Sequence, residues 1–136
     1  MNSLRTGSML LLWPLSIFET KSAESLKDPL IAGPIKMTKQ ENVGAAHKRF
    51  VLIKFNILFY FESSKSKEPR GVVNLEHYML SPLEQIKKRL WVFRFEKVAL
   101  SFAPRPKLYT FTFEDQHVAE QWHRVMLGEC ANRMAG

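Results

Sequence analysis

The stretch LYTFTFEDQHVAEQWHRVM, residues 108–126, decides the fold because its apolar residues change their spacing partway along it. In the first part Tyr109, Phe111 and Phe113 alternate with Leu and Thr, which is typical of a strand with one buried side. In the second part apolar residues return every three or four positions around Trp122, which indicates one side of an α-helix. The sequence therefore predicts a strand that is followed directly by a helix.

The predicted helix covers residues 115–127. Asp115 can cap its first turn, because a carboxylate accepts hydrogen bonds from the free N–H groups there and suits the helix dipole. Gly128 stands where the helix is expected to end. The side that we expect to face the core comprises Val118, Ala119, Trp122, Val125 and Met126.

Strand patterns fill the chain before this helix. The apolar runs 49–54 and 57–61 are separated only by Phe55 and Asn56, which predicts a tight hairpin with Asn56 in the left-handed conformation. Trp91, Phe93 and Phe95 form a second alternating run, and shorter strands are expected at 33–39, 72–75 and 77–80. The fold class predicted is mainly β: a curled antiparallel sheet, or partly open barrel, of about seven strands capped by one C-terminal α-helix.

The charge is concentrated in the middle of the chain. The whole sequence carries a formal net charge of +7, whereas residues 46–107 alone hold 13 basic and 5 acidic groups. A domain polarised in this way attracts anions, and nucleic acid, a membrane surface and a phosphorylated headgroup are the obvious partners. One basic cluster, residues 87–89, is expected in a loop before Trp91.

The N-terminal part contains the apolar run Met9–Phe18, which is too short to cross a membrane as a helix. A secretory signal has a core of this length, but Pro14 interrupts it and no small-residue cleavage site follows. The run either belongs to a poorly ordered extension or packs on the domain as an apolar strap. We predict an extension over residues 1–30, a domain over residues 31–128 and a tail over residues 129–136.

Several functional classes find no support in the sequence. The four histidines are dispersed without metal-ligand spacing, the single Cys130 cannot form an internal disulfide, and no phosphate-binding or nucleophile motif occurs. We therefore expect no enzyme, no metal and no cofactor, and a cytoplasmic location. Single-stranded nucleic acid is disfavoured because the aromatic residues fall on the expected buried side of the strands rather than on a stacking surface.

Several segments, in this order, resemble a pleckstrin homology (PH) domain. Residues 48–52, 57–61 and 68–75 are similar to its second, third and fourth strands. The strand that ends at Phe113 and the helix around Trp122 are similar to its last strand and capping helix. Residues 68–75, with the wording EPRGVVNL, also resemble small endosomal adaptors of the sesquipedalian type and the PH-domain-containing family J.

The resemblance implies a set of phosphate-binding residues. PH domains that bind phosphoinositides use a lysine on the first strand and a K-x-R pattern on the second. By position the first is Lys36 or Lys39, while Lys48 stands at the arginine position and Ala46 replaces the lysine. By strand alternation the neighbouring Arg49 points opposite Lys48. The other implied contacts are Tyr60 on the third strand and Lys65, Lys67 and Arg70 on the loop that follows it.

The resemblance therefore implies a non-catalytic membrane-targeting or adaptor module. It would bind phosphoinositide or an anionic membrane surface through a basic loop mouth, in peripheral association with the membrane. Because the K-x-R pair is incomplete, we expect this attraction to be weak and sensitive to salt. The alternative is a PH-like scaffold that binds a protein partner without specific lipid recognition.

Overall fold

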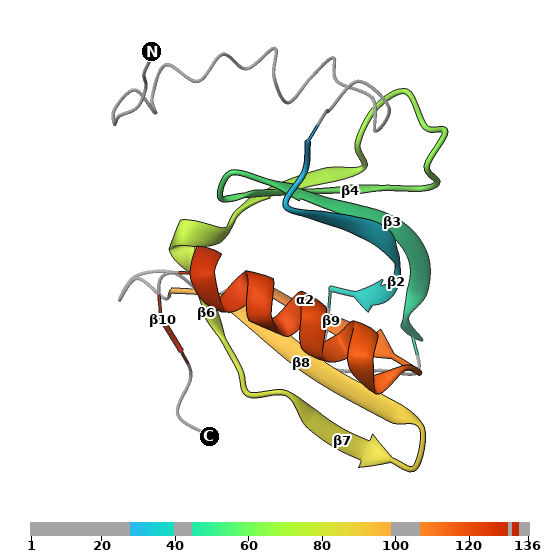
Figure 1. The fold of residues 1–136 in the computed structure, drawn as a ribbon. Coiled ribbons are helices and arrows are strands. Elements are labelled where there is room, and N and C mark those ends of the chain that lie inside the picture. The colour runs from blue at the N-terminus through green and yellow to red at the C-terminus, as the bar shows by residue number, and fades with distance from the viewer. Residues whose placement is uncertain (1–27, 40–44, 99–106, 131, 134–136) are drawn as a thin grey trace.

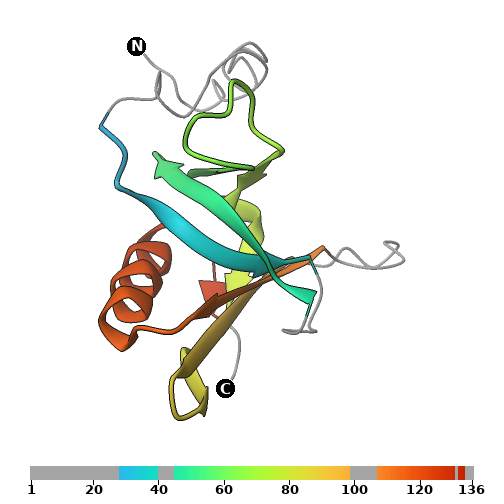
Figure 2. The same cartoon turned by 90° about the vertical axis from the view of Figure 1, so that its right-hand side faces the viewer.

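A computed structural model describes residues 28–39, 45–98, 107–130 and 132–133. In these ranges a sheet curls around a core, and an α-helix lies across its open side (Figures 1 and 2). The predicted N-terminal extension, with its apolar run, lies almost entirely outside the described residues. The elements are β2 (Ile31–Thr38), β3 (His47–Lys54), β4 (Ile57–Phe61), β5 (Gly71–Asn74), the 3-10 turn η3 (Leu75–His77), β6 (Tyr78–Leu80), β7 (Glu84–Lys87), β8 (Leu90–Lys97), β9 (Leu108–Phe113), α2 (Gln116–Glu129) and β10 (Asn132–Arg133).

The strands form one sheet in the order β10-β6-β8-β9-β2-β3-β4-β5, with β7 paired to β8 beside this path. Every pairing is antiparallel except that of β10 with β6. The predicted fold class is confirmed: β2 to β6, β8 and β9 are the expected seven strands, and the short β7 and β10 add to them. Among the described residues, no helix is both long enough and apolar enough to span a membrane.

Helix α2 packs against β8 and β9 through Trp122. The indole is 3% exposed, and its ring stands at 90° to that of Phe111 with 6.2 Å between the centroids. Ala119 and Met126 are buried beside it, whereas Val118 is 38% exposed. The prediction that Val118 belongs to the buried side was therefore wrong, because the side of the helix that faces the core is centred on Ala119, Trp122 and Met126.

The helix begins as predicted and ends later than predicted. The Asp115 carboxylate accepts hydrogen bonds from the N–H groups of His117 (2.8 Å) and Val118 (3.2 Å), so it caps the first turn. Gly128 lies inside the helix rather than after it. The helix stops because Cys130 turns to an extended conformation, and its N–H still donates to the carbonyl of Met126 (2.9 Å).

The hairpin between β3 and β4 has the expected two-residue turn, since Lys54 pairs with Ile57. The left-handed residue is Phe55 (φ 58°), not Asn56. Asn56 instead ties the turn to the next strand, because its Nδ2 donates to Oδ1 of Asn74 (3.3 Å) and its carbonyl accepts from the N–H of Leu75 (2.9 Å). Because these contacts hold Asn56, it is Phe55 that adopts the left-handed conformation of the turn.

The basic cluster at residues 87–89 also differs from expectation. We expected a loop, but Lys87 ends β7, and Lys88 and Arg89 form the turn into β8. The turn is held by a hydrogen bond from Nε2 of Gln85 to the carbonyl of Lys88 (2.8 Å). The cluster therefore sits at the tip of a hairpin.

We predict that Trp122→Ala lowers the free energy of unfolding by about 3–5 kcal/mol, because it removes a large buried ring and leaves a cavity between the helix and the sheet. Urea unfolding followed by circular dichroism measures the loss. The matched control is Val118→Ala on the exposed side of the same helix, which should change stability by about 0.5 kcal/mol or less. A loss below about 1 kcal/mol for Trp122→Ala would mean that the helix does not close the sheet.

Candidate anion-binding site

A pocket of about 330 Å³ opens where the end of β2 and the start of β3 meet β4 and the residue before β5. The antiparallel register creates it, because Met37 lies opposite His47, Val51 lies opposite Tyr60, and Tyr60 lies opposite Gly71. Its described lining comprises Met37, Thr38, Lys39, Ala45, His47, Arg49, Tyr60 and Arg70.

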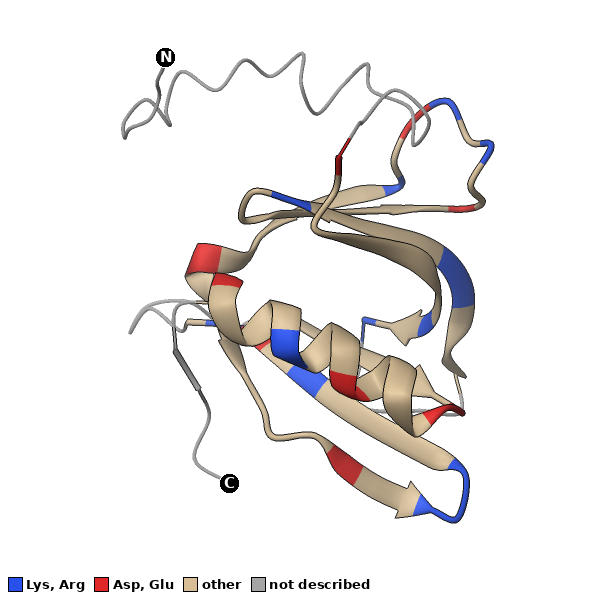
Figure 3. Cartoon of the chain, viewed as in Figure 1, with Lys and Arg blue, Asp and Glu red and all other residues tan. Residues whose placement is uncertain are grey.

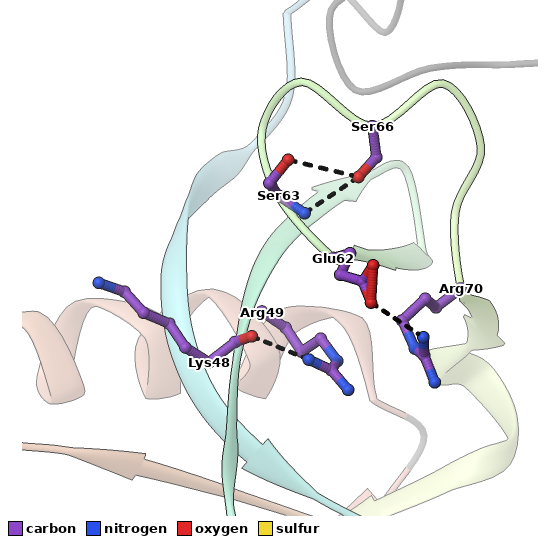
Figure 4. Close-up of polar contacts among 6 residues, drawn as sticks. All are labelled: Lys48, Arg49, Glu62, Ser63, Ser66 and Arg70. Carbon is purple, nitrogen blue, oxygen red and sulfur yellow. Dashed lines mark hydrogen bonds and ion pairs between the residues drawn. The ribbon is translucent and has the colours of Figure 1, made fainter.

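Strand alternation along β3 decides which cations reach this pocket. His47 and Arg49 line it, and Lys48 does not. Figure 4 shows the side chain of Lys48 on one side of the strand, while those of Arg49 and Arg70 extend on the other. An Nη1 of Arg49 donates to the backbone carbonyl of Lys48 (3.0 Å), which helps to hold the guanidinium in place.

This arrangement leaves Lys48 outside the pocket. Arg49 lines the pocket instead, together with His47, which the sequence reasoning left out of the predicted site. The sequence did contain an indication of this orientation. Arg49 alternates along β3 in step with Val51 and Ile53, which belong to the main core, so the three side chains lie on the same side of the strand. This indication was obscured because Leu52, on the opposite side of the strand, is also apolar and also buried.

The two lysines on the other side line a separate groove of about 520 Å³ between β2 and α2. Lys36 and Lys48 share this groove with Glu114 and Asp115, and Nζ of Lys36 lies 3.3 Å from Oε2 of Glu114. The charges of these two lysines and two carboxylates cancel within the groove. The structure therefore separates Lys36 and Lys48 from the other predicted site residues and gives them acidic neighbours.

The pocket that Tyr60 lines differs from this groove in its charge. Lys39, Arg49 and Arg70 contribute three permanent positive charges, and the part of its lining that the structure describes includes no carboxylate. Arg70 is paired through Nη1 with Oε2 of Glu62 (3.2 Å), but both side chains are more than half exposed, so water screens this contact and it is weak.

The loop between β4 and β5 carries both basic and acidic residues (Figure 3), and it leads into Arg70, which lines this pocket. It carries Lys65 and Lys67, which are exposed and do not line the pocket. The loop is held by a hydrogen bond from the N–H of Ser63 to Oγ of Ser66 (3.0 Å). Of the predicted site residues, Lys39, Arg49, Tyr60 and Arg70 therefore come together, Lys65 and Lys67 flank them, and Lys36 and Lys48 lie elsewhere.

Tyr60 forms the floor of the pocket and joins it to the core. It is 4% exposed, and Nζ of Lys39 lies 5.6 Å from the centroid of its ring, in cation–π range. Beneath it, the ring of Tyr109 lies 6.1 Å away and that of Tyr78 follows. Burial, together with the neighbouring tyrosines Tyr60 and Tyr78, raises the pKa of Tyr109, and burial likewise raises that of Tyr78. These two hydroxyls therefore stay protonated at neutral pH.

Gly71 makes room for this ring. A Cβ on Gly71 would overlap the ring and hydroxyl of Tyr60 on the adjacent strand. The place of Tyr60, and with it the floor of the pocket, depends on the absence of a side chain at residue 71.

The chain belongs to the PH domain family, because residues 29–131 match the family model for the PH domain. Human Sesquipedalian-1 is similar to it, with 30% identity over 82 residues that make up 60% of this chain and 30% of that protein. Mouse Sesquipedalian-1 is 28% identical over 81 residues, which are 60% of this chain and 28% of that protein. The chain therefore matches less than a third of the length of these curated relatives.

Solved structures show the same fold. The crystal structure of the Slm1 PH domain in complex with inositol 4-phosphate has a TM-score of 0.61 and 11% identity, and the match covers 77% of this chain and 99% of that chain. The C-terminal PH domain of pleckstrin in complex with D-myo-Ins(1,2,3,4,5)P5 has a TM-score of 0.53 and 11% identity, with 76% and 99% covered. At these identities the likeness establishes the fold alone.

We predict that Gly71→Ala lowers the free energy of unfolding by about 1–3 kcal/mol, because the added methyl displaces the Tyr60 ring from a packed site. Chemical denaturation measures the change, and the near-ultraviolet circular dichroism of the tyrosines should change with it. Gly33→Ala is the control, since its Cβ would stand at an ordinary 3.9 Å from Cζ2 of Trp122. Equal effects of the two substitutions would contradict the role given to Gly71.

Proposed function

We propose that this PH domain binds a phosphoinositide headgroup on an anionic membrane surface through the pocket of Lys39, His47, Arg49, Tyr60 and Arg70. The observation that carries the proposal is the convergence of three permanent cations on one pocket whose described lining has no carboxylate. Phosphate groups suit such a site, because charge-assisted hydrogen bonds to Lys and Arg are stronger than neutral ones.

Each side chain of the pocket has a distinct part in this proposal. Arg49 is half-buried and held by the carbonyl of Lys48, so its fork of donors is already oriented for a phosphate. Lys39 brings a flexible positive charge above the ring of Tyr60. Arg70 can leave its exposed partner Glu62 at little cost, since such surface pairs contribute only about 0–1 kcal/mol.

Lys65 and Lys67 would meet the membrane surface around the bound headgroup. Both are exposed on the loop beside the pocket, where they add long-range attraction to anionic lipid without contacting the headgroup directly. Each basic group near such a surface contributes about 1 kcal/mol, and this contribution falls as salt screens it. The chain would then associate peripherally with the cytoplasmic face of a membrane.

The inositol phosphates in the solved complexes of Slm1 and pleckstrin support a headgroup as the ligand class. A histidine at residue 47, where a lysine would complete a K-x-R pattern with Arg49, argues for modest affinity, because histidine carries no permanent positive charge. An adaptor role would require a protein partner as well. The competing hypothesis is a scaffold that binds protein without lipid, and the experiments below distinguish the two.

We predict that Arg49→Ala weakens binding to vesicles that contain phosphoinositide by about 10–100-fold, since a charged hydrogen bond contributes about 1.5–3 kcal/mol. The matched control is Lys48→Ala, which removes the same charge from the other side of β3 and should change binding by about twofold or less. Flotation with phosphatidylcholine vesicles, alone, with phosphatidylserine, or with phosphoinositide at equal total charge, gives the comparison at two salt concentrations.

Equal losses for Arg49→Ala and Lys48→Ala would show attraction by overall charge and would remove the pocket from the mechanism. Failure of the unmodified chain to float with any of the anionic vesicles would overturn the lipid proposal and favour the scaffold.

A gain of binding is also expected. His47→Lys restores the family's K-x-R pattern and adds one permanent charge to the pocket, so affinity should rise about fivefold, as one added basic group near the surface contributes about 1 kcal/mol. Gln121→Lys adds the same charge in the groove beside α2 and is the control. The same rise in both variants would contradict a specific role for residue 47.

A further inference from the structure

The hairpin of β7 and β8 carries at its tip a basic and apolar group that has no part in the pocket described above. Lys87, Lys88 and Arg89 are consecutive, and all three are exposed. Ile86, which comes directly before them, is 41% exposed. We call residues 86–89 the tip segment. An exposed isoleucine beside three cations is a surface that can meet a partner which is both anionic and apolar.

A β-bulge places Ile86 in this segment. Gln85 lies opposite Trp91 and Lys87 lies opposite Leu90, so Ile86 has no counterpart on β8. Bulges of this kind redirect a side chain and bend the strand. The turn that follows is held by the hydrogen bond from Nε2 of Gln85 to the carbonyl of Lys88 (2.8 Å). The isoleucine is therefore presented by a folded hairpin and not by an irregular loop.

The positive charges of the tip segment are not neutralised within the described part of the chain. The carboxylate of Glu84, on the same strand, lies 3.8 Å from Nη1 of Arg94. The carboxylate of Glu114 lies 3.3 Å from Nζ of Lys36. No described carboxylate lies within ion-pair distance of residues 87–89. The three charges are therefore a local surplus, which attracts an anionic partner.

The tip segment lies on the same side of the molecule as the other basic segments. Figure 1 shows the hairpin of β7 and β8 and the loop between β4 and β5 at the lower and upper ends of the right-hand side, with β3 between them. Figure 2 turns this side toward the viewer, and Figure 3 shows Lys and Arg on all three segments. A flat surface laid against this side meets all three segments at once, which favours a membrane over an acidic protein that covers one of them.

We propose that the tip segment is a second membrane contact. In this contact residues 87–89 lie among anionic headgroups, and the side chain of Ile86 enters the boundary between headgroups and acyl chains, because apolar area and positive charge add in binding to such a boundary. The inference goes beyond the headgroup pocket and rests on the proposed function only in that the ligand is again an anionic membrane. The tip segment responds to surface charge as a whole, so a soluble inositol phosphate is not its ligand.

Flotation of the full chain with vesicles of phosphatidylcholine and phosphatidylserine, without phosphoinositide, tests this contact. Lys87→Gln with Lys88→Gln should weaken binding about tenfold or more, since each basic group near an anionic surface contributes about fivefold. The matched control is Lys97→Gln with Lys107→Gln, which removes the same charge at the other end of β8, where the N–H of Lys97 donates to the carbonyl of Lys107 (2.8 Å). At about 0.1 M salt, where attraction beyond about 10 Å is screened, the control should change binding about twofold or less.

Equal losses for the two double variants, or failure of the unmodified chain to float with these vesicles, would overturn the proposal. Unchanged flotation of the tip variant would also overturn it and would leave an acidic protein as the partner of the cluster. The tip and the pocket can fail separately. Retention by phosphatidylserine vesicles reports on the tip segment, whereas additional binding to phosphoinositide at equal total charge reports on the pocket.

An environment-sensitive dye tests whether residue 86 enters the membrane boundary. Cys130 is the single cysteine of the chain, so Cys130→Ser with Ile86→Cys gives one labelling position for a nitrobenzoxadiazole dye. Its emission should rise and shift to the blue with phosphatidylserine vesicles, and nitroxide-labelled lipid should quench it. The control is Val98→Cys in the same background, at a residue that is 38% exposed just after β8, and it should show neither change. No change at residue 86, or the same change at both residues, would overturn the proposal.

Discussion

The register of β3 between β2 and β4 is the constraint on which the rest of this structure depends. Arg49 lies opposite Ile35 on one neighbour, and Val51 lies opposite Tyr60 on the other. Because side chains alternate along a strand, this register turns His47 and Arg49 to the side that leads into the main core, and turns Lys48 to the opposite side. A slip of one residue would exchange every cation and every core residue between the two sides.

The same constraint divides the positive charge of the chain into two unlike environments. On one side Lys36 and Lys48 lie among acidic residues, and the charges balance. On the other side three cations meet without a carboxylate among their described neighbours in the pocket. The net charge of +7 is therefore a weak guide to function by itself, since what attracts a phosphate is the local surplus that the strand register produces.

Regular periodicity predicted most of the fold. The alternation of aromatic residues predicted β8 and β9. The spacing of apolar residues around Trp122 predicted the capped helix. The site was predicted less well for a physical reason: residues 50–53 are apolar on both sides of β3, so alternation could not tell which side faces the core. The turn at Phe55 accompanies contacts of Asn56 with Asn74 and Leu75, and beyond the predicted end of the helix Cys130 still packs against the core; no local pattern records these tertiary contacts.

Chemical-shift mapping tests the assignment of the pocket most directly. A soluble inositol phosphate is titrated into the ¹⁵N-labelled chain, and the backbone amides are followed one by one. The account predicts the largest shifts at Lys39, His47, Arg49 and Arg70, with little change at Lys36 and Glu114. Shifts centred on the groove beside α2, or on the hairpin tip at residues 87–89, would contradict it.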